Sequence, residues 1–148
     1  MLLNKKLKSL IITTGIILLS GCSTYTEFVG DKKLVVEKVG STYARITHAS
    51  LYTVESNQIL LRGKLKRRSF QRGAIPGHLD VQLMNLDGKI FKEGEFRYSQ
   101  KGSISRVSLF SIPIQIDPAL ISTVRIAHHV FGSHPAFVKP LWRDITLD

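Results

Sequence analysis

The sequence has a single cysteine, one tryptophan and only 11 carboxylate side chains against 21 lysines and arginines in 148 residues. A lone cysteine excludes an intramolecular disulfide and a cysteine-rich zinc or iron–sulfur site, because each of these needs several thiols. The chain has no Gly-x-Ser-x-Gly sequence, no glycine-rich phosphate loop and no visible carboxylate pair for glycoside hydrolysis. The carboxylates expected at turns or on outward-facing positions are Asp80, Asp87, Glu93 and Glu95. We therefore expect a protein that is not an enzyme.

Long hydrophobic runs are also missing, and the main apolar stretch lies near the N-terminus. It runs from Leu10 to Leu19, whereas a helix needs about 20 residues to cross a bilayer. Three lysines and no acidic residue precede it: Lys5, Lys6 and Lys8. A basic stretch followed by a short apolar one is the layout of a secretory signal, so we expect export rather than a transmembrane helix.

The signal ends in Leu19-Ser20-Gly21-Cys22, which resembles the lipobox of bacterial lipoproteins. The resemblance implies that the lipoprotein signal peptidase recognises Leu19, Ser20 and Gly21 and cuts before Cys22. The Cys22 thiol would then receive a diacylglycerol, and its amino group a fatty acid such as palmitate. Each buried CH₂ contributes ~0.8 kcal/mol, so two or three acyl chains predict stable membrane attachment. Ser23 follows instead of Asp, which by the enteric sorting rule favours the outer membrane, on its periplasmic face, within the cell envelope.

Removal of residues 1–21 leaves 127 residues with a formal net charge of +7, a length typical of one domain. The composition, 43% apolar and 22% charged, excludes a chain that is disordered throughout. We expect residues 22–33 to form the lipidated N-terminus and a short tether, and residues 34–148 a single domain. Its C-terminal tail, from residue 131, contains prolines and aromatics. We expect the tail to pack back on the domain, with docking to a partner as the alternative.

Apolar side chains recur at every second position in seven runs, which predicts an all-β domain. We expect a two-sheet antiparallel β-sandwich, immunoglobulin-like in outline, because two sheets with one apolar face each bury those faces against each other. Residues 80–91 loosely resemble hairpins of immunoglobulin-like and transthyretin-like sandwiches. Asp87-Gly88 predicts a tight turn, and Asp117-Pro118 the start of one helical turn. The seven expected strands are 34–39, 43–55, 59–68, 78–85, 90–98, 105–112 and 123–130.

The same alternation predicts which face of each strand is buried, because successive side chains of a strand point to opposite faces. The side chains expected to face the core include Ile59, Leu61, Leu65, Leu79, Val81, Leu83, Val107, Leu109, Val124 and Ile126.

Basic residues occupy the outward positions of the expected strand 59–68. Four of them predict a positive stripe about 20 Å long, and others continue into the loop 69–77, which has exposed-looking Phe70 and Ile75. Such a stripe attracts polyanions, and export disfavours nucleic acid, so the expected partner is an envelope protein or an anionic envelope component. The alternative is a solvated face that prevents edge pairing. The basic residues are Arg62, Lys64, Lys66, Arg67, Arg68 and Arg72.

Histidines offer a second possible function. His78 and Asp80 share one strand face, and His128, His129 and His134 cluster near the C-terminus. Imidazole and carboxylate are ligands of zinc and copper, so a metal- or small-ligand-binding lipoprotein is the alternative reading. His128 falls on a core-facing position and is expected to be hydrogen-bonded there, while His129 points the opposite way. No cofactor is expected, and the candidate metal ligands are His78, Asp80, His129 and His134.

Overall fold

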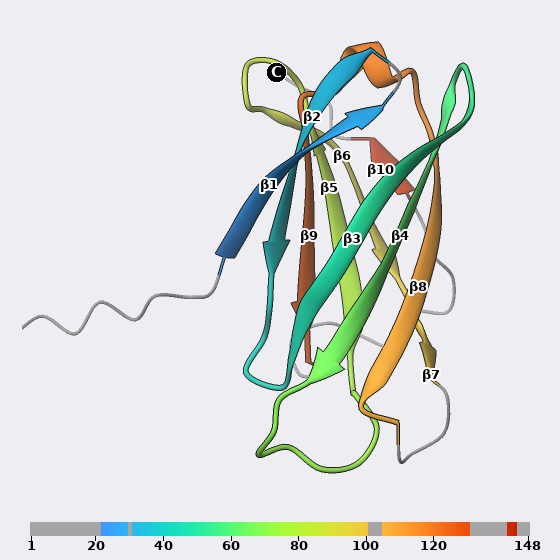
Figure 1. Cartoon of the computed structure of the whole chain (residues 1–148). Helices are drawn as coiled ribbons and strands as arrows, with labels where there is room; N and C mark the ends of the chain where they lie inside the picture. Colours follow the sequence, from blue (N-terminus) through green and yellow to red (C-terminus); the bar gives the residue numbers. More distant parts are fainter. Residues whose placement is uncertain (1–21, 30, 101–104, 131–141, 145–148) are drawn as a thin grey trace, which may run out of the picture.

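The computed structural model describes residues 22–29, 31–100, 105–130 and 142–144. In these residues ten strands form two sheets packed face to face, which confirms the predicted all-β sandwich (Figure 1). All seven predicted strands are present, and three short or terminal strands, β1, β7 and β10, are added to them. The larger sheet contains, in spatial order, β1 (Cys22–Val29), β2 (Lys32–Val39), β9 (Thr123–His129), β5 (His78–Met84), β6 (Ile90–Phe96) and β10 (Trp142–Asp144). The smaller sheet contains β3 (Ala44–Glu55), β4 (Gln58–Arg67), β8 (Val107–Gln115) and β7 (Ser99–Gln100).

The strand order differs from the prediction in two respects. First, β2 runs parallel to β9, with Val36 opposite Val124, so the sandwich is not purely antiparallel. Second, the first two predicted strands, β2 and β3, lie in different sheets, whereas the first two strands of an immunoglobulin constant domain share one sheet. Both differences have one physical reason. Alternation along a strand sets its two faces but does not determine which strand lies beside it.

The segment expected to be a tether is instead largely part of the sheet. Residues 22–29 form β1 and pair antiparallel with β2, with Cys22 opposite Val39. Threonine, tyrosine, phenylalanine and valine, which favour strands, dominate this segment. Val29 is buried, and a carboxylate oxygen of Glu27 accepts a hydrogen bond of 2.7 Å from the backbone N–H of Leu51 in the smaller sheet. The first described strand therefore begins at the residue that is predicted to be lipidated.

The core consists of the alternate side chains that face between the two sheets. The predicted inward positions on β4, β5 and β9 are all buried. The prediction for β8 is wrong, because Leu109 is 38% exposed and Phe110, Ile112 and Ile114 are buried instead. This strand has apolar side chains on both of its faces. The face with the bulkier apolar side chains, Phe110, Ile112 and Ile114, is the one that is buried. The confirmed core positions are Ile59, Leu61, Leu65, Leu79, Val81, Leu83, Val124 and Ile126.

Strands β4 and β8 approach closely at Gly63, whose Cα partner is Phe110. A Cβ atom on Gly63 would lie 2.2 Å from Cζ of Phe110 and 2.3 Å from the carbonyl oxygen of His48. The phenylalanine ring and the neighbouring strand thus occupy the space that a side chain would need. A register shift in the β3–β4 pairing occurs at the same place, between Ile46 and His48.

The predicted turns are present. Gly88 has φ of 75°, and the side-chain oxygen of Asn85 accepts hydrogen bonds from the backbone N–H groups of Asp87 and Lys89 between β5 and β6. Asp117 caps a 3₁₀ helix (Pro118–Leu120) by accepting from the backbone N–H of Ala119 at 2.8 Å.

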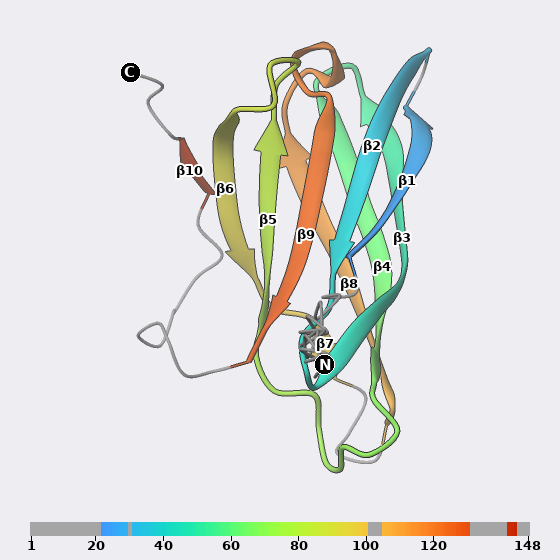
Figure 2. The same cartoon turned by 90° about the vertical axis from the view of Figure 1, so that its left-hand side faces the viewer.

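The only described part of the C-terminal tail is β10, which pairs with the outer edge of β6 (Figure 2). Its register places Trp142 opposite Gly94. This short segment extends the edge of the larger sheet, and the rest of the tail lies outside the described residues.

Candidate functional site

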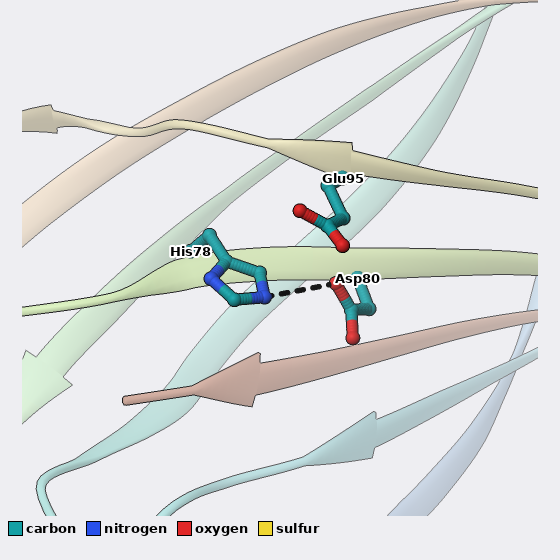
Figure 3. Close-up of side chains that lie close together, drawn as sticks. All are labelled: His78, Asp80 and Glu95. Carbon is teal, nitrogen blue, oxygen red and sulfur yellow. Dashed lines mark ion pairs between the residues drawn. The ribbon is translucent and has the colours of Figure 1, made fainter. Parts of the chain in front are cut away.

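Three strands of the larger sheet bring two histidines and two carboxylates together on its outer face. Strand β5 supplies His78 and Asp80, β6 supplies Glu95 and β9 supplies His129 (Figure 3 draws the first three). The register places His129 opposite His78 and Glu95 opposite Asp80. Directly opposed residues of antiparallel strands have Cβ atoms about 4.5–5.5 Å apart on the same face, so these four side chains are neighbours. We call them the His/carboxylate cluster.

Asp80 lies at the centre of the cluster. Its Oδ1 is 3.2 Å from Nε2 of His78, and its Oδ2 is 3.1 Å from Nε2 of His129. One ligand-type atom from each of His78, Asp80 and Glu95 lies within 4.8 Å of the others. The rings of His78 and His129 stack with centroids 5.8 Å apart. Nitrogen and oxygen donors therefore converge on a small volume at the surface of the sheet.

The structure brings together three of the four histidine and carboxylate candidates from the sequence, and His134 lies outside the described residues. Glu95 was not among the predicted ligands, and its position opposite Asp80 was not predicted. A register shift between Leu83 and Met84 explains the miss. Continuing the Met84–Ile90 pairing without this shift would place Gly94, not Glu95, opposite Asp80.

The position of His78 depends on the residue before it. Gly77 has φ of 109°, in the left-handed region that favours glycine, and a Cβ there would lie 1.8 Å from the carbonyl oxygen of His129. Because Gly77 has no side chain, the backbone just before β5 can lie directly against the end of β9. This close approach supports the opposed arrangement of His78 and His129.

His128 is a hydrogen-bonded core residue, as the alternation predicts, and is only 2% exposed. Its Nε2 lies 3.0 Å from the carbonyl oxygen of Pro76, which can only accept, so Nε2–H donates. The Ser41 hydroxyl lies 2.7 Å from Nδ1, and the Tyr98 hydroxyl 3.1 Å from Nε2. Burial lowers the pKa of His128 to about 4, although the bond to Pro76 opposes this shift. His128 therefore stays neutral and ties the loops at one end of the sandwich together.

The outer face of the smaller sheet is basic. Arg62, Lys64 and Lys66 are exposed on β4, as predicted, and β3 adds exposed Arg45 directly opposite Lys66. Within β3, β4 and β8 the sole carboxylate is that of Glu55, the last residue of β3. We call these four cationic residues and their surroundings the basic face.

Apolar and aromatic side chains are interleaved with these charges. Tyr52 is 49% exposed, and its ring centroid lies 5.9 Å from the Arg62 guanidinium carbon. Leu109, the side chain wrongly expected in the core, lies opposite Lys64 instead. The basic face therefore offers apolar contact as well as charge.

The basic stripe ends earlier than predicted. Arg68 lies beyond the last residue of β4, and its Nε donates a hydrogen bond of 3.0 Å to the carbonyl oxygen of Ser41. Arg67 is half-buried, and its guanidinium donates to the carbonyl oxygen of Gly73. These two arginines hold the neighbouring loops in place.

The 69–77 loop is divided between surface and core. Phe70 is 74% exposed and Arg72 is exposed, as predicted, but Ile75 is 1% exposed. The hydroxyl of Tyr98 donates to the carbonyl oxygen of Ile75 at 3.1 Å, and burial raises the pKa of this hydroxyl above its usual range. The end of the loop is thus buried in the core through Ile75. Only the first half of the loop is available for contact with a partner.

Comparison with profiles of known protein families, with curated proteins and with solved structures yields no match. Among the described residues, no helix has the length and apolar character needed to span a bilayer.

Proposed function

We propose that this protein is a non-enzymatic lipoprotein of the bacterial cell envelope that binds a phosphate-bearing component of the membrane surface through its basic face. One observation carries the proposal. Arg45, Arg62, Lys64 and Lys66 are all exposed on one sheet face, and the strands that form this face have no carboxylate except Glu55 at the end of β3. Concentrated positive charge of this kind binds polyanions through the release of their counterions.

The charge arrangement opposes the stability of the isolated protein. Arg45 lies directly opposite Lys66, and like charges at opposed positions destabilise a sheet. A face whose role is only to be solvated usually intersperses both signs of charge. An anionic ligand would neutralise this repulsion, which supports a binding role over a merely solvated one.

The position of the predicted anchor supports a ligand at the membrane surface. Cys22 is the first residue of β1, so a lipid attached there would be joined to the sandwich without a spacer. In this proposal the sandwich, and with it the basic face, therefore stays within reach of lipid head groups and the phosphates of lipopolysaccharide on the periplasmic side of the outer membrane. An acidic envelope protein is the alternative partner.

The test uses the full-length protein in its native envelope, with a photocrosslinking residue in place of Leu109 at the centre of the basic face. We expect crosslinks to lipid or lipopolysaccharide that disappear in the Arg62→Glu, Lys64→Glu, Lys66→Glu variant. A crosslinker in place of Leu86, which is 78% exposed on the turn between β5 and β6, is the matched control. Crosslinks to an acidic protein would favour the alternative, and crosslinks insensitive to charge reversal would refute a binding role for this face.

Anchoring is tested separately with Cys22→Ser. We expect this variant to lose lipid labelling and membrane retention completely, because no other thiol exists in the chain. Retention of the label would refute the lipobox assignment without bearing on the basic face.

A further inference from the structure

We propose that the His/carboxylate cluster is a binding site for one divalent transition-metal ion, Zn²⁺ being the ion that its donors fit best. His78, Asp80 and Glu95 would be the principal ligands, and His129 would complete the set. The site lies on the larger sheet and is independent of the basic face, so this inference does not rest on the proposed membrane ligand.

The donor set selects the class of ion. Two imidazole nitrogens and two carboxylate oxygens are ligands that Zn²⁺ accepts, whereas Ca²⁺ and Mg²⁺ prefer oxygen ligands throughout. The two histidines therefore favour a transition metal over the abundant hard cations. Cu²⁺ and Ni²⁺ accept the same donors but prefer square-planar geometry, which a sheet surface with ligands on three strands does not impose.

The distances suit a tetrahedral ion. With metal–ligand bonds of about 2.1 Å, neighbouring ligand atoms lie about 3.4 Å apart. Nε2 of His78 lies 3.2 Å from Oδ1 of Asp80, and Nε2 of His129 lies 3.1 Å from the other oxygen, Oδ2. The contacting atoms of His78, Asp80 and Glu95 lie within 4.8 Å, so each would move inward by only about 1 Å to reach this spacing. An ion would replace existing contacts between ligands and would not require the strands to move.

One histidine of the cluster is fixed in position by its surroundings, whereas the other is exposed and can rotate. The side chain of His78 is 13% exposed and follows Gly77, whose close approach to β9 positions it. The side chain of His129 is 49% exposed. Its ring now stacks on His78, so the two rings do not both aim a lone pair at one point. Rotation of the exposed His129 ring, with β5 and β6 unchanged, would direct its nitrogen to the ion.

Electrostatics favour occupation of the site. Asp80 and Glu95 lie at directly opposed positions of β5 and β6, where two negative charges repel each other. A divalent cation neutralises both carboxylates at once. Binding to the folded chain alone also raises the free energy of unfolding by linkage, which provides a second measurable effect.

The test is isothermal titration calorimetry, in which ZnCl₂ is added to the protein purified in detergent from its native envelope. We expect one equivalent to bind to the wild type, and at least tenfold weaker binding to His78→Gln and to Glu95→Gln. His48→Gln is the matched control, because His48 is exposed on β3, outside the cluster, and contacts Ser50. This control should bind Zn²⁺ as the wild type does.

Thermal unfolding gives a second measurement. Zn²⁺ should raise the Tm of the wild type and of His48→Gln but leave that of His78→Gln unchanged. Should Glu95→Gln fail to fold, the exposed His129→Gln retains the test, with an expected loss of affinity of several fold. The proposal is overturned if the wild type shows no saturable Zn²⁺ binding, or if His78→Gln binds as tightly as the wild type. In those cases the cluster consists only of contacts between histidine and carboxylate side chains.

Discussion

The two sheets of this sandwich carry their charges differently on their outer faces. On the larger sheet, carboxylates lie beside basic side chains and imidazole rings. The Arg125 side chain donates to a carboxylate oxygen of Glu37 at 2.7 Å, and Asp80 contacts His78 and His129. On the smaller sheet, Arg62, Lys64 and Lys66 line one strand without an acidic neighbour in β3 or β8 other than Glu55 at the end of β3.

This difference indicates which kind of ligand each face can bind. The outer face of the larger sheet brings carboxylates and imidazole rings together at short range, so that face can accept a small cation that joins them. The charges of the smaller sheet have the same sign and repel, so that face favours an extended anion. Three predictions test whether the two faces are as independent as this comparison implies.

The largest effect is expected from Gly63→Val, which disturbs β4 beneath the basic face. The new side chain would meet Phe110 and the carbonyl oxygen of His48, and we expect a loss of about 3 kcal/mol in the free energy of unfolding. Chemical denaturation measures this loss.

The control for this variant is Gly73→Ala. Gly73 has φ of 79° with nothing within 4 Å of its Cβ position, so only the backbone conformation opposes a side chain and about 1 kcal/mol is expected. If Gly63→Val and Gly73→Ala lowered the free energy of unfolding equally, the close packing of Phe110 on Gly63 would not be important for stability. A Gly63→Val protein that still folds should bind Zn²⁺ unchanged if the two sheets act independently.

The second prediction concerns the pH dependence of stability and its source in His128, which lies in the core on the opposite side of β9 from His129. Histidine has an ordinary pKa of about 6.5, and burial lowers that of His128 to about 4. Between these two pH values the unfolded chain binds a proton that the folded chain does not. The free energy of unfolding should therefore decrease as the pH falls from about 6.5 to about 4, by up to about 3 kcal/mol.

Denaturant titrations at a series of pH values measure this decrease. His128→Gln should be less stable than the wild type at neutral pH. Between pH 6.5 and 5, where carboxylates contribute least to the pH dependence, its free energy of unfolding should change little with pH. His129→Gln should keep the pH dependence. If His129→Gln removed the dependence instead, the surface cluster and not the core would be the source of the pH sensitivity.

The smallest effect is expected from Lys66→Glu. The substitution places a carboxylate opposite Arg45 and replaces a repulsive pair with an attractive one, so we expect a gain of about 0.2–1 kcal/mol in the free energy of unfolding. The same change should weaken binding of the membrane-surface ligand. Lys89→Glu, exposed on the turn between β5 and β6, is the control with the same change in charge. A loss of stability in Lys66→Glu would contradict the view that the basic face is retained for binding at the expense of stability.

Several local features were readable from the sequence because they depend on neighbouring residues along the chain. Asp87-Gly88 indicated a turn that the structure contains, and Asp117 caps a helical turn as expected. Alternation also placed His128 correctly in the core, since it shares its strand face with Val124 and Ile126. Each of these conclusions needed only the period of a strand or the chemistry of a turn.

The sequence was less informative where two solutions had similar local patterns. On β8, Val107 and Leu109 alternate as well as Phe110 and Ile112 do, and only packing against the other sheet selects the second pair. Arg68 continues the basic period of β4, but the chain leaves the strand before it and its side chain binds the Ser41 carbonyl. No local signal distinguishes these outcomes.

The sequence by itself determined that the chain is all-β, where seven of its strands lie and which face of most of them is buried. It also carries the lipobox resemblance on which the predicted anchor at Cys22 depends. Only the tertiary structure decided that β2 lies parallel to β9, that residues 22–29 join the sheet, and that Glu95 and His129 meet at Asp80. The physical reason is that side-chain alternation is a property of one strand, whereas strand order and register are set by contacts between segments far apart in the chain.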